Sequence, residues 1–104
     1  MQRVAFKMKL FKGYEEEYKK RHDEVWDELK SLLKAKGVKD FSIFLDEETN
    51  MLFAYLTIDD ESKLDDLPAE PVQQNWWAYM KDIMETNHDN SPARTILKEV
   101  FYMP

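Results

Sequence analysis

The chain has 104 residues, no cysteine and a formal charge of −6 at pH 7, from 21 acidic and 15 basic side chains. This length predicts one domain over residues 1–104. The absence of cysteine excludes disulfides, a thiolate nucleophile and cysteine-ligated metal sites. The acidic balance argues against a nucleic-acid partner, and no stretch approaches the roughly 18 apolar residues that span a bilayer. We therefore expect a cytoplasmic location, with no nucleic-acid or membrane partner.

The first two predicted elements are a strand and a long helix. Residues 3–10 alternate between apolar and polar side chains, which predicts a strand with one apolar face. Residues 13–36 have helical spacing, and Gly37 is well placed to end that helix. The apolar stripe of the predicted helix consists of Tyr14, Tyr18, His22, Val25, Trp26, Leu29, Leu32 and Leu33.

A hairpin follows the helix. Residues 41–46 and 50–59 are rich in aromatic and branched side chains, and a short polar connection joins them. Both faces of these strands carry apolar groups, for example Phe41 on one face and Phe44 on the other. A single layer of helices covers only one face of a sheet. We therefore expect a partner subunit or a substrate pocket on the other face.

The rest of the chain predicts two helices, a loop and a last strand. Asp59 or Asp60 caps a short helix over residues 61–67, which Pro68 interrupts. A second helix is predicted over residues 71–86, a loop over 87–92 and a strand over 95–102.

The resulting order is strand, helix, strand, strand, helix, strand. This is the split β-α-β pattern of ferredoxin-like α+β folds, with a four-stranded antiparallel sheet and helices on one face. The uncovered face predicts a homodimer.

Several kinds of chemistry are missing from the sequence. Its two glycines, Gly13 and Gly37, cannot form a phosphate-binding loop or a dinucleotide fingerprint. Its two histidines, His22 and His88, lie far apart and lack metal-ligand spacing. We therefore expect neither a nucleotide cofactor held by such loops nor a metal ion, and we expect His88 to be a surface residue of the loop.

His22 is the strongest candidate for catalysis. It lies four residues after Tyr18 and four before Trp26, so on a single helix the three side chains share one face. An imidazole among aromatic groups can act as a general acid or base near neutral pH. The alternative is a buried neutral histidine that is hydrogen-bonded to the backbone or to the Tyr18 hydroxyl. The pattern alone favours this second interpretation.

A tryptophan pair is the second feature. Trp76 and Trp77 are adjacent, so their side chains point about 100° apart on a helix. One indole can therefore pack in the core while the other lines an edge or a cavity. Indole rings suit sugars, whose C–H faces are apolar and whose rims carry hydroxyls. Plain core packing or a dimer contact is the alternative.

Taken together, these segments resemble the L-rhamnose mutarotase family. The resemblance covers essentially the whole chain. It is carried by YKKRHDEVWDEL at 18–29, FSIFLD, NMLFAYLTID, QQNWWAYMKDIM at 73–84, NHDNSP at 87–92 and the terminal LKEVFYMP. It implies a dimeric ferredoxin-like fold and an isomerase of rhamnose metabolism. Such an aldose 1-epimerase interconverts the anomers of L-rhamnose, or of a close deoxysugar, without a cofactor.

The resemblance also implies site residues. His22 matches the family's catalytic histidine, which is the proton donor. Tyr18, Trp76 and Trp77 match substrate-contacting residues. Phe41 stands where the family has a tyrosine, so the ring is kept and its hydroxyl is lost. Two other functions remain open from the residues alone: a non-catalytic dimeric module that binds a small apolar ligand, and a different cofactor-free enzyme of the same fold.

Overall fold

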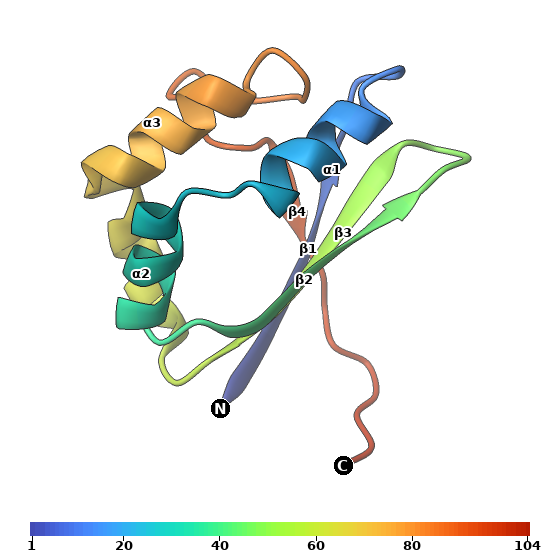
Figure 1. The fold of residues 1–104 in the computed structure, drawn as a ribbon. Helices are drawn as coiled ribbons and strands as arrows, with labels where there is room; N and C mark the ends of the chain where they lie inside the picture. Colours follow the sequence, from blue (N-terminus) through green and yellow to red (C-terminus); the bar gives the residue numbers. More distant parts are fainter.

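The computed structural model describes residues 1–104 and contains one sheet with the strand order β2-β3-β1-β4. All three pairs of neighbouring strands are antiparallel. The strands are β1 (Gln2–Lys9), β2 (Lys39–Asp46), β3 (Met51–Ile58) and β4 (Arg94–Ile96). The helices all lie on one side of this sheet (Figure 1). The ferredoxin-like α+β prediction is therefore confirmed.

The register between β1 and β3 determines which side chains form the core. The pairing runs from Gln2 opposite Ile58 to Lys9 opposite Met51. Directly paired residues share a face of the sheet, and alternate pairs face the helices. These inward-facing side chains are buried: Val4, Phe6, Met8, Leu52, Ala54, Leu56 and Ile58. The predicted strands at 3–10, 41–46 and 50–59 are confirmed.

The prediction of one helix over residues 13–36 is wrong. The segment forms α1 (Glu15–Asp23) and α2 (Asp27–Ala35), and Trp26 between them has extended backbone angles. Lys20 and Arg21 lie in the last turn of α1, where basic residues interact favourably with the negative end of the helix dipole. Asp27 and Glu28 are favourable in a first turn. The charges therefore favour ending one helix and starting another, although the apolar spacing continues across the break.

The second helical region also differs from the prediction. A 3₁₀ helix, η1 (Glu61–Ala69), begins after Asp60, whose carboxylate accepts a hydrogen bond from the Ser62 N–H (3.0 Å). Pro68 lies inside η1 and does not end it.

The next helix, α3 (Pro71–Met80), is shorter than the predicted 71–86. Beyond it, Met84 forms a bridge with Leu10, and the Phe11 N–H donates to the Ile83 carbonyl at 2.9 Å. The buried side chains of Ile83 and Met84 follow helical spacing, but pairing with the end of β1 satisfies their backbone instead.

The last predicted strand is too long. It covers residues 95–102, whereas β4 ends at Ile96 and Leu97 makes one more hydrogen bond, to the Ala5 carbonyl (2.8 Å). Continuing the register of β4 would bring Val100 opposite Gln2, where β1 begins. Residues 98–104 instead have no regular structure and leave the sheet as an exposed arm (Figure 1).

Candidate functional site

A cleft of about 1480 Å³ lies between the helices and the inner face of the sheet. All five candidate residues from the sequence line it: Tyr18, His22, Phe41, Trp76 and Trp77. They come from three elements, since α1 carries Tyr18 and His22, β2 carries Phe41 and α3 carries both tryptophans. The fold therefore brings residues that lie up to 59 positions apart, as Tyr18 and Trp77 do, to the same cleft.

His22 lies in the last turn of α1 and is held from three sides. Its ring stacks on Tyr18, with centroids 4.3 Å apart, and lies perpendicular to the Trp76 ring, with centroids 5.4 Å apart. Its Nδ1 lies 3.0 Å from the backbone carbonyl oxygen of Tyr18. A carbonyl only accepts hydrogen bonds, so Nδ1 carries the proton and donates it. In the neutral ring, Nε2 therefore keeps its lone pair.

The other nitrogen of His22 faces open space. Nε2 has no hydrogen-bond partner in the protein. No enclosed side-chain nitrogen or oxygen lacks a partner, so Nε2 must reach the surface of the cleft. The sequence left open whether His22 bonds to the backbone or to the Tyr18 hydroxyl. The structure shows the backbone bond, and this bond leaves Nε2 available for proton transfer.

Burial determines the protonation states of the pair. Desolvation lowers the pKa of His22, and the Tyr18 carbonyl and the charge of Asp23 offset this only in part. The imidazole is therefore neutral at pH 7. Burial also raises the pKa of the Tyr18 hydroxyl well above its ordinary value, so it stays protonated. That hydroxyl has no partner in the protein either, so it too opens to the cleft as a donor.

The two tryptophans differ in burial, as predicted. Trp76 is buried, whereas Trp77 is only half-buried against the core. The prediction that Tyr18, His22 and Trp26 share one face of a single helix is wrong for Trp26, because the helix breaks between α1 and α2. Trp26 instead lies nearly perpendicular to Trp76, with ring centroids 5.1 Å apart, and stacks on Tyr79.

Phe41 reaches the cleft through a bulge at the start of β2. Lys39 pairs with Thr57 and Ser42 with Tyr55, so β2 has one residue more than β3 at this point. Asp40 takes up the irregularity with a positive φ of 52°. The Phe41 ring then lies on the inner face and is 42% exposed.

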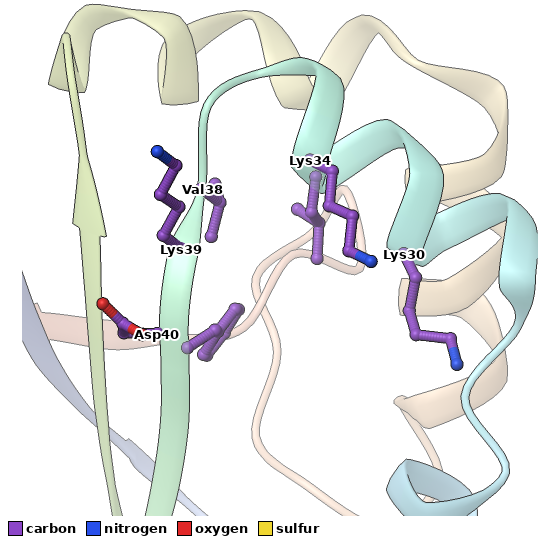
Figure 2. A pocket seen from close by; sticks show the side chains of 7 residues that line it. Lys30, Lys34, Val38, Lys39 and Asp40 are labelled. Carbon is purple, nitrogen blue, oxygen red and sulfur yellow. The ribbon is translucent and has the colours of Figure 1, made fainter.

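A smaller hollow of about 600 Å³ adjoins Phe41. Figure 2 shows its polar rim, with Lys30 and Lys34 from α2 and Lys39 and Asp40 from β2. It contains no histidine, so the candidate for proton transfer lies in the larger cleft alone.

Arg21 is a residue that positions the site without lining the cleft, and the sequence analysis missed it. Its guanidinium donates to the carboxylates of Glu17 (2.7 Å) and Asp82 (2.9 Å) and to the Tyr79 carbonyl (2.7 Å). It also lies 4.3 Å from the centroid of the Tyr79 ring. These contacts tie α1 to the end of α3, and so hold His22 against Trp76. In the sequence, Arg21 belongs to a run of acidic and basic residues, and nothing in that local pattern indicates that its side chain is buried.

The structure offers no metal-binding cluster. No three histidine, aspartate or glutamate side chains come together in an arrangement that could hold a metal ion. None of the helices has the length and apolarity needed to cross a membrane.

Comparison with known proteins gives consistent matches over the full length. The sequence model of a family described as "L-rhamnose mutarotase" matches residues 3–103. An L-rhamnose mutarotase from Formosa agariphila is 52% identical over 103 residues, which cover 99% of each chain. One from Mesorhizobium japonicum is 55% identical over 102 residues, covering 98% of this chain and 97% of the relative.

Solved structures give the same match. The crystal structure of an L-rhamnose mutarotase from Formosa agariphila is 51% identical and superposes with a TM-score of 0.94 over 100% of both chains. A dimeric ferredoxin-like protein from an uncultured marine organism is 17% identical, with a TM-score of 0.52 over 97% of this chain and 96% of that one. This second match shows the shared fold alone.

Proposed function

This chain belongs to the L-rhamnose mutarotase family, and on that premise we propose that it interconverts the α and β anomers of L-rhamnose, with His22 as the group that moves the proton. Membership of a family of isomerases favours an enzyme over a non-catalytic binding module. The observation that carries the proposed mechanism is the open Nε2 of a neutral His22 in the cleft.

The reaction needs only one proton to move between two oxygens on the same carbon. Nε2 of His22 takes the proton of the anomeric hydroxyl, and the bond between C1 and the ring oxygen breaks. The imidazolium then gives that proton to the ring oxygen, which leaves an open-chain aldehyde. Rotation about the C1–C2 bond and the reverse steps close the ring as the other anomer. Nδ1 stays bonded to the Tyr18 carbonyl throughout, so the ring keeps its orientation.

The remaining site residues bind and orient the sugar. The faces of Trp76 and Trp77 suit the apolar face of the pyranose and its C6 methyl group. The Tyr18 hydroxyl, which is protonated and lacks a partner, donates to a sugar oxygen. Phe41 provides an apolar ring at the mouth of the cleft, without the hydroxyl that the family's tyrosine would supply.

The proposal is tested by measuring anomer exchange of L-rhamnose by NMR magnetisation transfer. The wild-type protein is expected to accelerate exchange. His22→Gln is expected to lower kcat by about 10²- to 10⁴-fold, which is the usual contribution of general acid–base catalysis. The matched control is His88→Gln, because His88 is the other histidine and is exposed in the loop. A His22→Gln variant that is folded and fully active would contradict the proposed role.

Two further parts of the proposal concern the assembly and its location. We propose a homodimer that forms through the outer face of the sheet, where Phe44 is 67% exposed and lies directly opposite Phe53. We also propose a cytoplasmic location, which agrees with the absence of cysteine.

A further inference from the structure

Gln73 is a buried residue whose side-chain amide makes no hydrogen bond to the protein. Three polar residues are buried: Asn50, Thr57 and Gln73. The Asn50 amide donates to Glu15 (3.3 Å), and the Thr57 hydroxyl donates to the Lys39 carbonyl (3.1 Å). The amide of Gln73 makes no comparable bond, although the residue is only 6% exposed.

The position of Gln73 shows where its amide points. No enclosed side-chain nitrogen or oxygen lacks a partner, so the oxygen and nitrogen of this amide must both reach an open surface. Gln73 lines the cleft of the candidate site. It also lies three residues before Trp76 and four before Trp77 on α3, which is the spacing of neighbours on one helix face. The amide therefore opens into the cleft beside the two indoles.

Gln73 is almost fully buried, and the amide atoms reach open space only in the cleft, so a molecule bound in the cleft is the partner available to them. An amide offers two donors and two acceptor sites in one plane. Neighbouring hydroxyls of a pyranose each donate and accept, and so complement it. We propose that Gln73 is a substrate-binding residue whose amide hydrogen-bonds ring hydroxyls of the sugar that lies against Trp76 and Trp77, and so helps to determine which sugar is accepted; this rests on the proposed function.

This role predicts a particular pattern in the kinetics. The ring hydroxyls at C2, C3 and C4 do not change during anomer exchange, so bonds to them are equally strong in the ground and transition states. Losing such bonds raises KM and leaves kcat nearly unchanged. A residue that served only the packing of α3 would affect the stability of the protein before it affected KM.

The test uses Gln73→Met, which keeps the length of the side chain and removes its polar end. We expect KM for L-rhamnose to rise about 10-fold, as for the loss of one or two hydrogen bonds, with kcat within about 2-fold. We expect Tm to stay near the wild-type value, because the amide makes no hydrogen bond to the protein and methionine keeps the packing of the side-chain stem. The matched control is Gln74→Met, since the amide of Gln74 donates to the Pro68 carbonyl and does not line the cleft. It is expected to leave KM unchanged.

Sugars that lack one hydroxyl make the test specific. The KM ratio of variant to wild type is measured for L-rhamnose and for its 2-, 3- and 4-deoxy analogues. We expect the ratio to fall toward one for the analogue that lacks the hydroxyl bound by Gln73. An unchanged KM for L-rhamnose, or the same ratio for all four sugars, would overturn the assignment of Gln73 while leaving the proposed function intact. A wild-type protein that neither binds L-rhamnose in calorimetry nor accelerates its exchange would overturn both.

Discussion

At the scale of single residues, one backbone hydrogen bond decides how His22 can act. Because the Tyr18 carbonyl holds the proton on Nδ1, the neutral ring presents a base at Nε2. Protonation of the ring would remove that base. Desolvation lowers the pKa of His22, so the base form persists at a lower pH than for an exposed histidine. Burial disfavours the charged imidazolium, and it therefore keeps His22 in the neutral form that can accept a proton.

This geometry predicts the pH dependence of the enzyme. We expect kcat/KM for anomer exchange to be constant around pH 7 and to fall in acid, with a midpoint below about 6.5, the ordinary pKa of histidine. The direction follows from the lowered pKa, since the proton that inactivates Nε2 binds only at lower pH. NMR exchange rates between pH 4.5 and 8, each corrected for the uncatalysed rate at the same pH, give the profile. A midpoint above 6.5 would contradict the role of Nε2 as the base.

The substitution Phe41→Tyr would add the hydroxyl that the family's tyrosine carries and that this chain lacks. Its ring is 42% exposed at the mouth of the cleft, so a tyrosine hydroxyl can be added there at little cost in packing. If the family's tyrosine bonds the sugar, Phe41→Tyr should lower KM for L-rhamnose by about 2- to 10-fold, the value of one net hydrogen bond. The same substitution at Phe44, on the outer face, serves as the control and should leave KM unchanged. A higher KM for Phe41→Tyr would show that this chain's sugar is held differently.

At the scale of elements, the C-terminal end of α2 depends on Gly37. This residue has a φ of +90°, and its N–H donates to the Lys34 carbonyl while the Val38 N–H donates to the Leu33 carbonyl. Only glycine adopts this conformation without strain. A methyl group at Gly37 would also overlap the Asp59 carboxylate, which receives hydrogen bonds from the Asp60 N–H and Lys63.

Gly13 provides a matched comparison, because its φ is +94° and a methyl group there would meet no atom within 4 Å. We expect Gly13→Ala to lower the free energy of unfolding by about 1–2 kcal/mol, from backbone strain alone. Gly37→Ala should lose about 1 kcal/mol more, because Asp59 must move away from its partners. Urea unfolding of the two variants measures the difference, and equal losses would show that Asp59 adjusts freely.

The local sequence predicted strands better than helix ends. Alternation identified β1, because period-two burial is a direct consequence of the sheet. Two runs of aromatic and branched side chains around a short polar connection identified the hairpin of β2 and β3. The apolar spacing across residues 13–36 gave one helix, because it records which side chains are buried and not whether the backbone continues. The ends of α3 and β4 are set by pairing with β1, through Leu10 and Ala5. These contacts lie more than 70 residues away in sequence, so local patterns do not contain them.

The same limit applies to the site. The site residues that the sequence predicted, such as His22 and Trp76, could be recognised because their residue type alone suggests a role in proton transfer or sugar binding. Gln73 and Arg21 gain their importance from burial and from partners on other elements. Arg21 looked like part of a solvated run of charges, yet it is held between Glu17 and Asp82. Only the arrangement of α1 against α3 distinguishes it from its exposed neighbours Lys19 and Lys20.

At the scale of the whole molecule, the two faces of the sheet have different surroundings. The inner face forms the wall of the cleft, and the outer face has no helix over it (Figure 1). Phe44 and Phe53 form a directly opposed aromatic pair on the outer face, beside Tyr55. The C-terminal arm turns toward this side, where Glu99 pairs with Arg3 (2.6 Å) and the Tyr102 ring stacks on its guanidinium. Val100, Phe101 and Met103 remain 75–88% exposed.

An exposed apolar surface of this kind is unusual for a monomer and favours association of two copies. We expect the wild-type protein to sediment at twice the 12.5 kDa of one chain. The double substitution Phe44→Asp and Phe53→Asp should shift it to the monomer, because two pairs of charges would be buried across the interface. Tyr14→Asp introduces a charge at a comparably exposed aromatic residue before α1, and should leave the dimer intact. Sedimentation equilibrium measures all three proteins, and a monomeric wild type or a dimeric double variant would show that the outer face is not the interface.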